Sequence, residues 1–80
     1  MIGYRQLSHF SMKNKALLGI SDKAGCYSCC KIFPANEIKE YTDEGETALC
    51  PYCSVDSVVG DTSGYIISEE NLQLARKYWF

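Results

Sequence analysis

Apolar residues recur at helical spacing near the start of the chain. Ser11 can cap a helix there, with Asn14 at the third helical position. The apolar stripe that follows consists of Met12, Ala16, Leu17 and Ile20. This pattern predicts a helix that opens at Ser11 and turns its stripe toward the core.

A second helical pattern closes the chain. Ser68 is a suitable cap, Glu69 and Glu70 favour the positive N-terminus of a helix, and Arg76 and Lys77 favour its other end. The predicted apolar face consists of Leu72, Ala75, Tyr78 and Trp79. Because the chain closes on "YWF", we expect these aromatic side chains to dock on the chain's own core or on a second subunit.

The segment between the helices has the pattern of short strands. "EIKEY" and "ETALC" bracket "TDEG", a turn sequence, which predicts a β-hairpin with strands near 37–41 and 46–50. Further on, Val55, Val58 and Val59 have the spacing of a short helix that Gly60 could end. Their β-branched side chains favour a strand nearly as well.

Composition indicates one folded domain, residues 1–80. The chain has 80 residues, of which 46% are hydrophobic and 22% charged. A domain of this size often needs a metal, disulfides or a partner to be stable. The start of the chain lacks the pattern of a signal peptide, and no stretch is apolar enough for a membrane span. We therefore expect a cytoplasmic protein with reduced thiols and no membrane partner.

Four of the five cysteines have the spacing of a zinc site. Cys26 and Cys29 form one C-x2-C pair, Cys50 and Cys53 form another, and 20 residues separate the pairs. Two thiolates three residues apart can bend around one ion in a tight turn, here called a knuckle, and two knuckles supply a closed tetrahedron. Gly25 suits a close backbone turn before the first knuckle. We expect Ile32 and Phe33 to pack beneath the site.

Cys30 is the fifth cysteine, and we expect it to be a spare thiol beside the site. Its use as a ligand would need a neighbouring pair with Cys29 or C-x3-C spacing with Cys26, and adjacent residues rarely aim both sulfurs at one ion. Four cysteines leave no open position for a catalytic water, and the one histidine, His9, lies far upstream. The sequence therefore predicts one structural Zn²⁺ and no enzyme activity.

The chain resembles a family of small, uncharacterised bacterial cytoplasmic proteins. The resemblance rests on "GCYSC", "KIF", "EIKEYTDEGETALCPYC", "DSVVGDTSG" and the closing "YWF". It implies a small zinc-stabilised α+β fold like a zinc ribbon or treble clef, in which a β-hairpin joins two knuckles between N- and C-terminal helices. The ligands it implies are Cys26, Cys29, Cys50 and Cys53. Cys30 departs from the family pattern, and so does Ser54, which stands where glycine is usual and predicts an altered backbone.

Two classes of partner follow from these observations. The first is a protein, including a second copy of this chain, which the net charge of −2 and the aromatic end favour. The second is a nucleic acid, bound through Lys13, Lys15 and Lys31. Residues 1–31 carry five basic side chains against one acidic, and residues 37–61 carry seven acidic against one basic. The N-terminal third alone is basic, which favours the protein partner.

Overall fold

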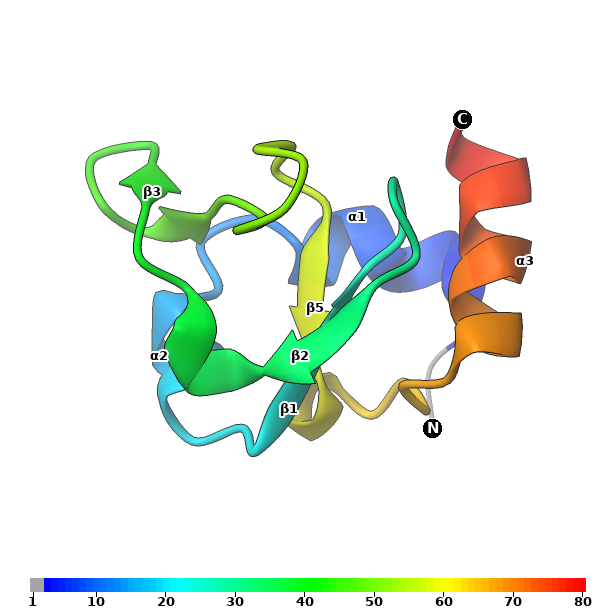
Figure 1. The fold of residues 1–80 in the computed structure, drawn as a ribbon, viewed down its shortest axis with the longest axis horizontal. Coiled ribbons are helices and arrows are strands. Elements are labelled where there is room, and N and C mark those ends of the chain that lie inside the picture. The colour runs from blue at the N-terminus through cyan, green and yellow to red at the C-terminus, as the bar shows by residue number, and fades with distance from the viewer. Residues whose placement is uncertain (1–2) are drawn as a thin grey trace.

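A three-stranded antiparallel sheet lies at the centre of the structure, and a separate two-stranded hairpin lies at one edge (Figure 1). The computed structural model describes residues 3–80. The strands are β1 (Lys23–Cys26), β2 (Ile32–Pro34), β3 (Tyr41–Thr42), β4 (Thr47–Ala48) and β5 (Val58–Gly60). The α-helices are α1 (Leu7–Phe10), α2 (Lys15–Gly19) and α3 (Glu69–Trp79), and 3-10 turns span Tyr4–Gln6, Ala35–Glu37 and Asp61–Ser63. The predicted α+β class is confirmed.

Strand β1 is the middle of a three-stranded sheet with the order β2-β1-β5. Ala24 lies opposite Phe33 on one side and Gly60 on the other, and both pairings are antiparallel. The last residue of β1, Cys26, lies opposite Val58. The register therefore places a cysteine at the end of the central strand.

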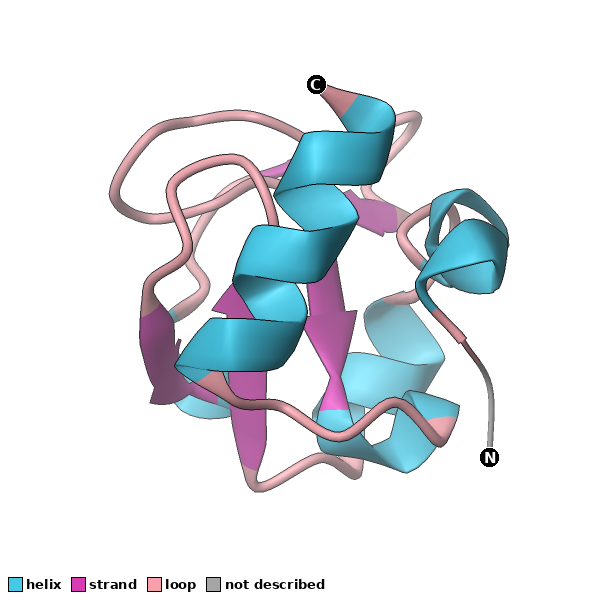
Figure 2. Cartoon of the chain, turned by 90° about the vertical axis from the view of Figure 1, so that its right-hand side faces the viewer, coloured by secondary structure: helices cyan, strands magenta, loops and turns pink. Residues whose placement is uncertain are grey.

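Neighbouring residues of the strands point to opposite faces of this sheet, as the pleat requires. One face carries the core cluster of Leu18, Ala24, Cys26, Phe33, Ala35, Ile38, Ala48, Cys50 and Val58. The other carries Leu7, Tyr27, Val59, Tyr65, Ile67, Leu72 and Ala75. Helix α3 crosses this second face (Figure 2). Gly25 belongs to β1 and lies beneath Leu72, so the prediction that it serves a turn was wrong.

The helix predicted to open at Ser11 is present only as α2, which starts later, at Lys15, so the predicted start and cap are wrong. Helix α1 ends at Phe10 and α2 begins at Lys15, because Lys13 between them has a φ of 49°. The side chain of Asn14 fixes this break: it donates to the carbonyls of Phe10 and Val58 and accepts from Ala48 N–H.

The break also changes which apolar residues face the core. Met12 and Ile20, two members of the predicted stripe, are 57% and 71% exposed. Leu7 and Leu18 are buried in their place. Two separate helices of about one turn each have no common apolar face. For this reason, helical spacing predicted the wrong buried residues here.

The predicted C-terminal helix is confirmed. Ser68 Oγ accepts a hydrogen bond from Asn71 N–H, 3.2 Å away, as an N-cap does. Leu72 and Ala75 are buried, but Tyr78 and Phe80 are 51% and 67% exposed. Trp79 is anchored by its Nε1, which donates to the carbonyl of Tyr4 over 2.8 Å. The aromatic end is therefore only partly docked on the chain's own core.

The structure also tests the predicted hairpin and the segment that contains Val58 and Val59. The hairpin is confirmed with shorter strands, β3 and β4, which pair Tyr41 with Ala48 and Thr42 with Thr47. Val58 and Val59 form strand β5, so Gly60 ends no helix there and instead pairs with Ala24. Within residues 3–80, the longest helix is too short and too polar to cross a bilayer.

Candidate metal centre

The sulfurs of Cys26, Cys29, Cys50 and Cys53 all lie within 4.8 Å of one another. Cys26 Sγ is 3.6 Å from Cys53 Sγ, and Cys29 Sγ is 3.7 Å from Cys50 Sγ. A tetrahedron with Zn–S bonds of about 2.3 Å has S–S edges of about 3.8 Å. Disulfide sulfurs are only about 2.05 Å apart, and all five cysteines are free. The spacing therefore fits one tetrahedral metal ion.

The first knuckle, Cys26–Cys30, and the second, Cys50–Ser54, have the same backbone hydrogen bonds. Cys30 N–H donates to the carbonyl of Cys26 at 2.8 Å, and Ser54 N–H donates to that of Cys50 at 2.9 Å. The amides two residues after each first cysteine point at its sulfur: Ser28 N is 3.3 Å from Cys26 Sγ, and Tyr52 N is 3.4 Å from Cys50 Sγ. N–H groups aimed at sulfur stabilise thiolates, so both knuckles are arranged for anionic ligands.

The residue after each C-x2-C pair has a left-handed backbone. Cys30 has a φ of 62° and Ser54 a φ of 64°. The altered backbone predicted at Ser54 is therefore confirmed, and Cys30 occupies the matching position of the first knuckle. Non-glycine residues adopt this conformation at a cost, which the knuckle hydrogen bonds offset.

The two first cysteines are buried and the two second cysteines are partly exposed. Burial raises the pKa of the Cys26 thiol well above its ordinary value, although hydrogen bonds from Ser57 and from backbone amides lower it in part. Burial also raises the pKa of Cys50. For Cys53, burial raises the pKa, but the Val55 amide and the neighbouring thiols outweigh it, and the net shift is downward. A bound cation would reverse the effect of burial, because it stabilises the thiolates directly.

Aromatic side chains shield one side of the centre. Phe33 is buried in the cluster that contains Cys26 and Cys50, and its ring contacts that of Tyr52 at a centroid distance of 5.6 Å. Lys31 Nζ lies 5.5 Å from the centre of the Tyr52 ring, and the Tyr52 hydroxyl donates to Glu37 at 2.7 Å. The expectation for Phe33 is confirmed. Ile32, expected beside it, is exposed instead.

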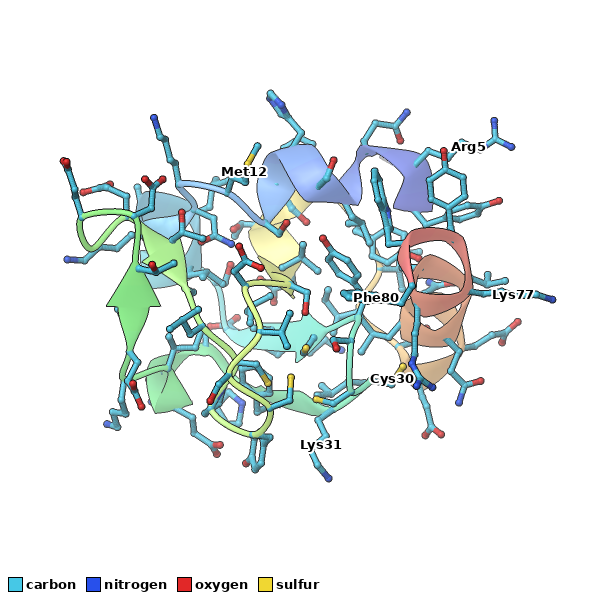
Figure 3. All side chains as sticks on the ribbon, turned by 90° about the horizontal axis from the view of Figure 1, so that it is seen from above. Arg5, Met12, Cys30, Lys31, Lys77 and Phe80 are labelled. Atoms are coloured by element: carbon cyan, nitrogen blue, oxygen red, sulfur yellow. The ribbon has the colours of Figure 1, made fainter. Side chains whose placement is uncertain are left out.

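Cys30 does not belong to the group of four clustered sulfurs. The Cys30 side chain packs against the core cluster that includes Leu72 and Ala75 of α3. Figure 3 shows Cys30 beside this helix. Burial raises the pKa of Cys30, although Arg76 lowers it in part. A raised pKa keeps the thiol protonated at neutral pH, which is the less reactive form.

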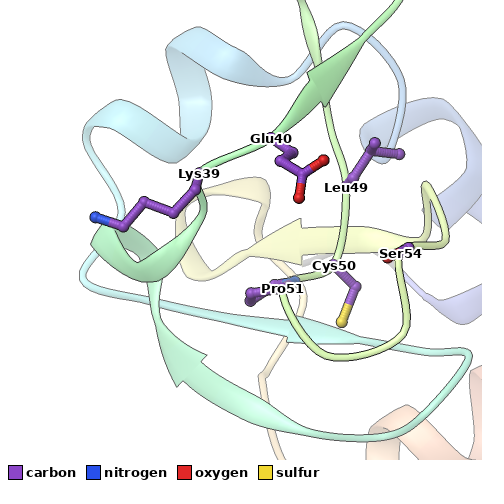
Figure 4. Close-up of a pocket in the computed structure, with 6 residues that line it drawn as sticks. All are labelled: Lys39, Glu40, Leu49, Cys50, Pro51 and Ser54. Carbon is purple, nitrogen blue, oxygen red and sulfur yellow. The ribbon is translucent and has the colours of Figure 1, made fainter.

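A small pocket lies beside the second knuckle, lined by Lys39, Glu40, Leu49, Cys50, Pro51 and Ser54 (Figure 4). Its volume is about 110 Å³, which is room for roughly three or four water molecules. Lys39 points away from the Cys50 side chain in this view. The pocket is therefore too small for a substrate of ordinary size.

Ser57 is a residue of the centre that the sequence did not reveal. Its Oγ lies 3.0 Å from Cys26 Sγ, across 31 positions of the chain. A serine four residues after Cys53 is no signal by itself, because the contact depends on the pairing of β1 with β5.

The three lysines predicted to contact nucleic acid, Lys13, Lys15 and Lys31, lie at two separate places in the structure. Lys13 and Lys15 adjoin the β3–β4 hairpin: Lys13 N–H donates to Thr47 Oγ1, and Lys15 N–H donates to the carbonyl of Glu46. Lys31 lies at the first knuckle, on the opposite side of the molecule from Met12, the neighbour of Lys13 (Figure 3). The contacts instead bring basic and acidic segments of the chain together.

Comparisons of the chain with protein-family models, with curated proteins and with solved structures found no match.

Proposed function

We propose that this protein binds one structural Zn²⁺ through Cys26, Cys29, Cys50 and Cys53 and acts as a protein-interaction module. The observation that carries the proposal is the cluster of four sulfurs within 4.8 Å at the tips of two matching knuckles. Four thiolates and tetrahedral spacing favour zinc among the common divalent ions. A shell of four protein ligands leaves no position for a reactive water, so we propose no enzyme activity for the metal.

Within the two fold types that the sequence suggested, the geometry favours a zinc ribbon. Both ligand pairs come from knuckles beside strands, the first between β1 and β2 and the second between β4 and β5. Helix α3 begins at Glu69, well after Cys53, and supplies no ligand. In a treble clef we would expect the second pair of ligands at the start of a helix.

The surface at the end of α3 supports a protein partner. Leu74, Tyr78 and Phe80 are exposed there beside Lys77, which points away from the molecule (Figure 3). Two grooves of about 540 and 360 Å³ meet at Lys77. Their lining residues are Gln73, Arg76 and Phe80 for the larger groove, and Tyr4, Leu74 and Tyr78 for the smaller. Exposed apolar side chains with a polar rim are typical of interaction surfaces.

Metal content tests the first part of the proposal. The mass of protein purified without added chelator is measured by native mass spectrometry, and we expect the mass of one chain with one zinc ion. Stripping the metal with a strong chelator should abolish the folded circular-dichroism spectrum, and added Zn²⁺ should restore it. Protein that keeps its fold and its stability without metal would refute a structural role.

The partner requires a separate experiment. A variant with Leu74→Glu and Tyr78→Glu is compared with the wild type in sedimentation equilibrium and in cross-linking within the native cell extract. Both substituted side chains are exposed, so zinc content should not change. We expect the wild type to form a complex, with itself or with another protein, that the variant loses. A complex that contains an oligonucleotide and dissociates as the salt concentration rises would instead favour the nucleic-acid alternative.

A further inference from the structure

The hydroxyl of Ser57 faces the metal centre from inside the protein. Ser57 is only 2% exposed, and among the described residues its Oγ has one hydrogen-bond contact, with Cys26 Sγ at 3.0 Å. The backbone of Ser57 is held independently, because its carbonyl accepts from Tyr27 N–H at 3.0 Å. Main chain and side chain of Ser57 therefore both bind the first knuckle, and the side chain binds only the ligand sulfur.

A comparison of the two knuckles shows that the fold does not require a polar side chain at this position. Ser57 lies four residues after Cys53, and Phe33 lies four residues after Cys29. Both side chains are buried, and the apolar Phe33 belongs to the cluster that contains Cys50. Since the matching position of an otherwise similar knuckle is apolar, the hydroxyl at position 57 needs another explanation.

We propose that Ser57 is a positioning residue of the metal centre, whose hydroxyl donates to the Cys26 sulfur and slows the loss of the ion. The inference rests on the proposed function, because it concerns the same four ligands. A metal-bound thiolate has no proton to give, so the serine must be the donor in the loaded protein. Partners of this kind fix the orientation of a ligand, and their removal typically weakens metal binding by about 10- to 100-fold.

Zinc release tests the proposal. The loaded wild type and the variant Ser57→Ala are mixed with excess chromogenic chelator, and the transfer of Zn²⁺ is followed by absorbance. We expect release from Ser57→Ala to be about tenfold faster. The matched control is Ser63→Ala, which removes another buried hydroxyl. Within residues 3–80, this hydroxyl donates to the carbonyl of Gly60 at 2.6 Å, accepts from Tyr65 N–H at 3.3 Å, and has no hydrogen bond with a cysteine. We expect the control to release zinc at the wild-type rate even if it is less stable.

A spectroscopic measurement separates positioning from general destabilisation. Loading with Co²⁺ in place of zinc gives thiolate-to-metal charge-transfer absorption, which should shift in Ser57→Ala and stay unchanged in Ser63→Ala. Ser57→Thr keeps the hydroxyl and should retain the wild-type spectrum and release rate. If Ser57→Ala does not fold in excess zinc, Ser57→Thr becomes the test variant. Release of zinc from Ser57→Thr faster than from the wild type would then overturn the proposal.

The outcomes distinguish this inference from the proposed function. Equal release rates and equal cobalt spectra for wild type and Ser57→Ala would overturn the role of Ser57 and leave the metal site intact. A wild type that takes up neither Zn²⁺ nor Co²⁺ would overturn both.

Discussion

Leu72 of helix α3 lies directly against Gly25 of the central strand. A Cβ atom at position 25 would be 2.8 Å from Leu72 Cδ1 and 3.1 Å from Ile67 Cγ2. The next residue along the strand is Cys26, a candidate ligand. The helix therefore packs on the backbone that holds the candidate metal centre, and no side chain separates them.

Gly25→Ala should destabilise the protein, because the added methyl group pushes α3 away from β1. We expect a loss of about 1–3 kcal/mol in the free energy of unfolding, the usual cost of overpacking. Urea titration with zinc in constant excess measures it. Gly19→Ala is the matched control, since a Cβ there meets nothing within 4 Å.

The double variant Gly25→Ala with Leu72→Ala tests the cause. If the clash between these two positions is responsible, the loss in the double variant will be smaller than the sum of the two single losses. Strict additivity would contradict the explanation.

Ser54→Gly should stabilise the protein. The left-handed backbone costs a non-glycine residue about 1–2 kcal/mol, and the greater freedom of glycine in the unfolded chain costs about 0.5–1 kcal/mol. The difference predicts a gain of up to about 1.5 kcal/mol, seen as a higher midpoint in thermal unfolding. Ser54→Val should have the opposite effect, since β-branched residues tolerate this conformation poorly. A lower midpoint for Ser54→Gly would show that the serine side chain has a role of its own.

Serine substitutions should separate the four ligands from the fifth cysteine. Cys26→Ser, Cys29→Ser, Cys50→Ser and Cys53→Ser should each lose most zinc during purification and unfold at lower temperature. Cys30→Ser should keep one zinc per chain, because this side chain packs beside the cluster under α3. Native mass spectrometry gives the metal content of all five variants. If Cys30→Ser were the variant that lost zinc while the other four kept it, the assignment of the four ligands would be wrong.

Metal binding should weaken as the pH falls. Burial raises the pKa of Cys26 and of Cys50, so both thiols hold their protons at neutral pH when no metal is bound. Zinc must displace those protons, and the affinity for zinc should therefore rise with pH. Calorimetry at pH 7 in buffers of different ionisation enthalpy counts the protons released. Release of no proton on binding would contradict this account.

The positions of the candidate ligands could be predicted from the sequence because each knuckle is a local structure. Cys26 and Cys50 each meet their partner cysteine within three residues, and the hydrogen bonds that shape each turn span only a few positions. The capped helix at Ser68 is local in the same sense. Patterns of this kind need no knowledge of distant contacts.

The features that the sequence did not predict depend on distant contacts. Asn14 breaks the N-terminal helix through bonds to Ala48 and Val58, more than 30 positions away. Ser57 reaches Cys26 only because β5 pairs with β1. The exposure of Tyr78 and Phe80 likewise depends on how α3 lies on the sheet, which helical periodicity does not determine.

The hairpin between the two knuckles is where we expect the chain to survive a cut. Its turn is exposed at Asp43 and Glu44, and each side of it carries two of the four sulfurs. If zinc is bound as proposed, a protease nick there would yield two fragments still held together by one shared ion and by the pairing of β1 with β5. Such a nicked molecule would migrate as one species until a chelator released its halves.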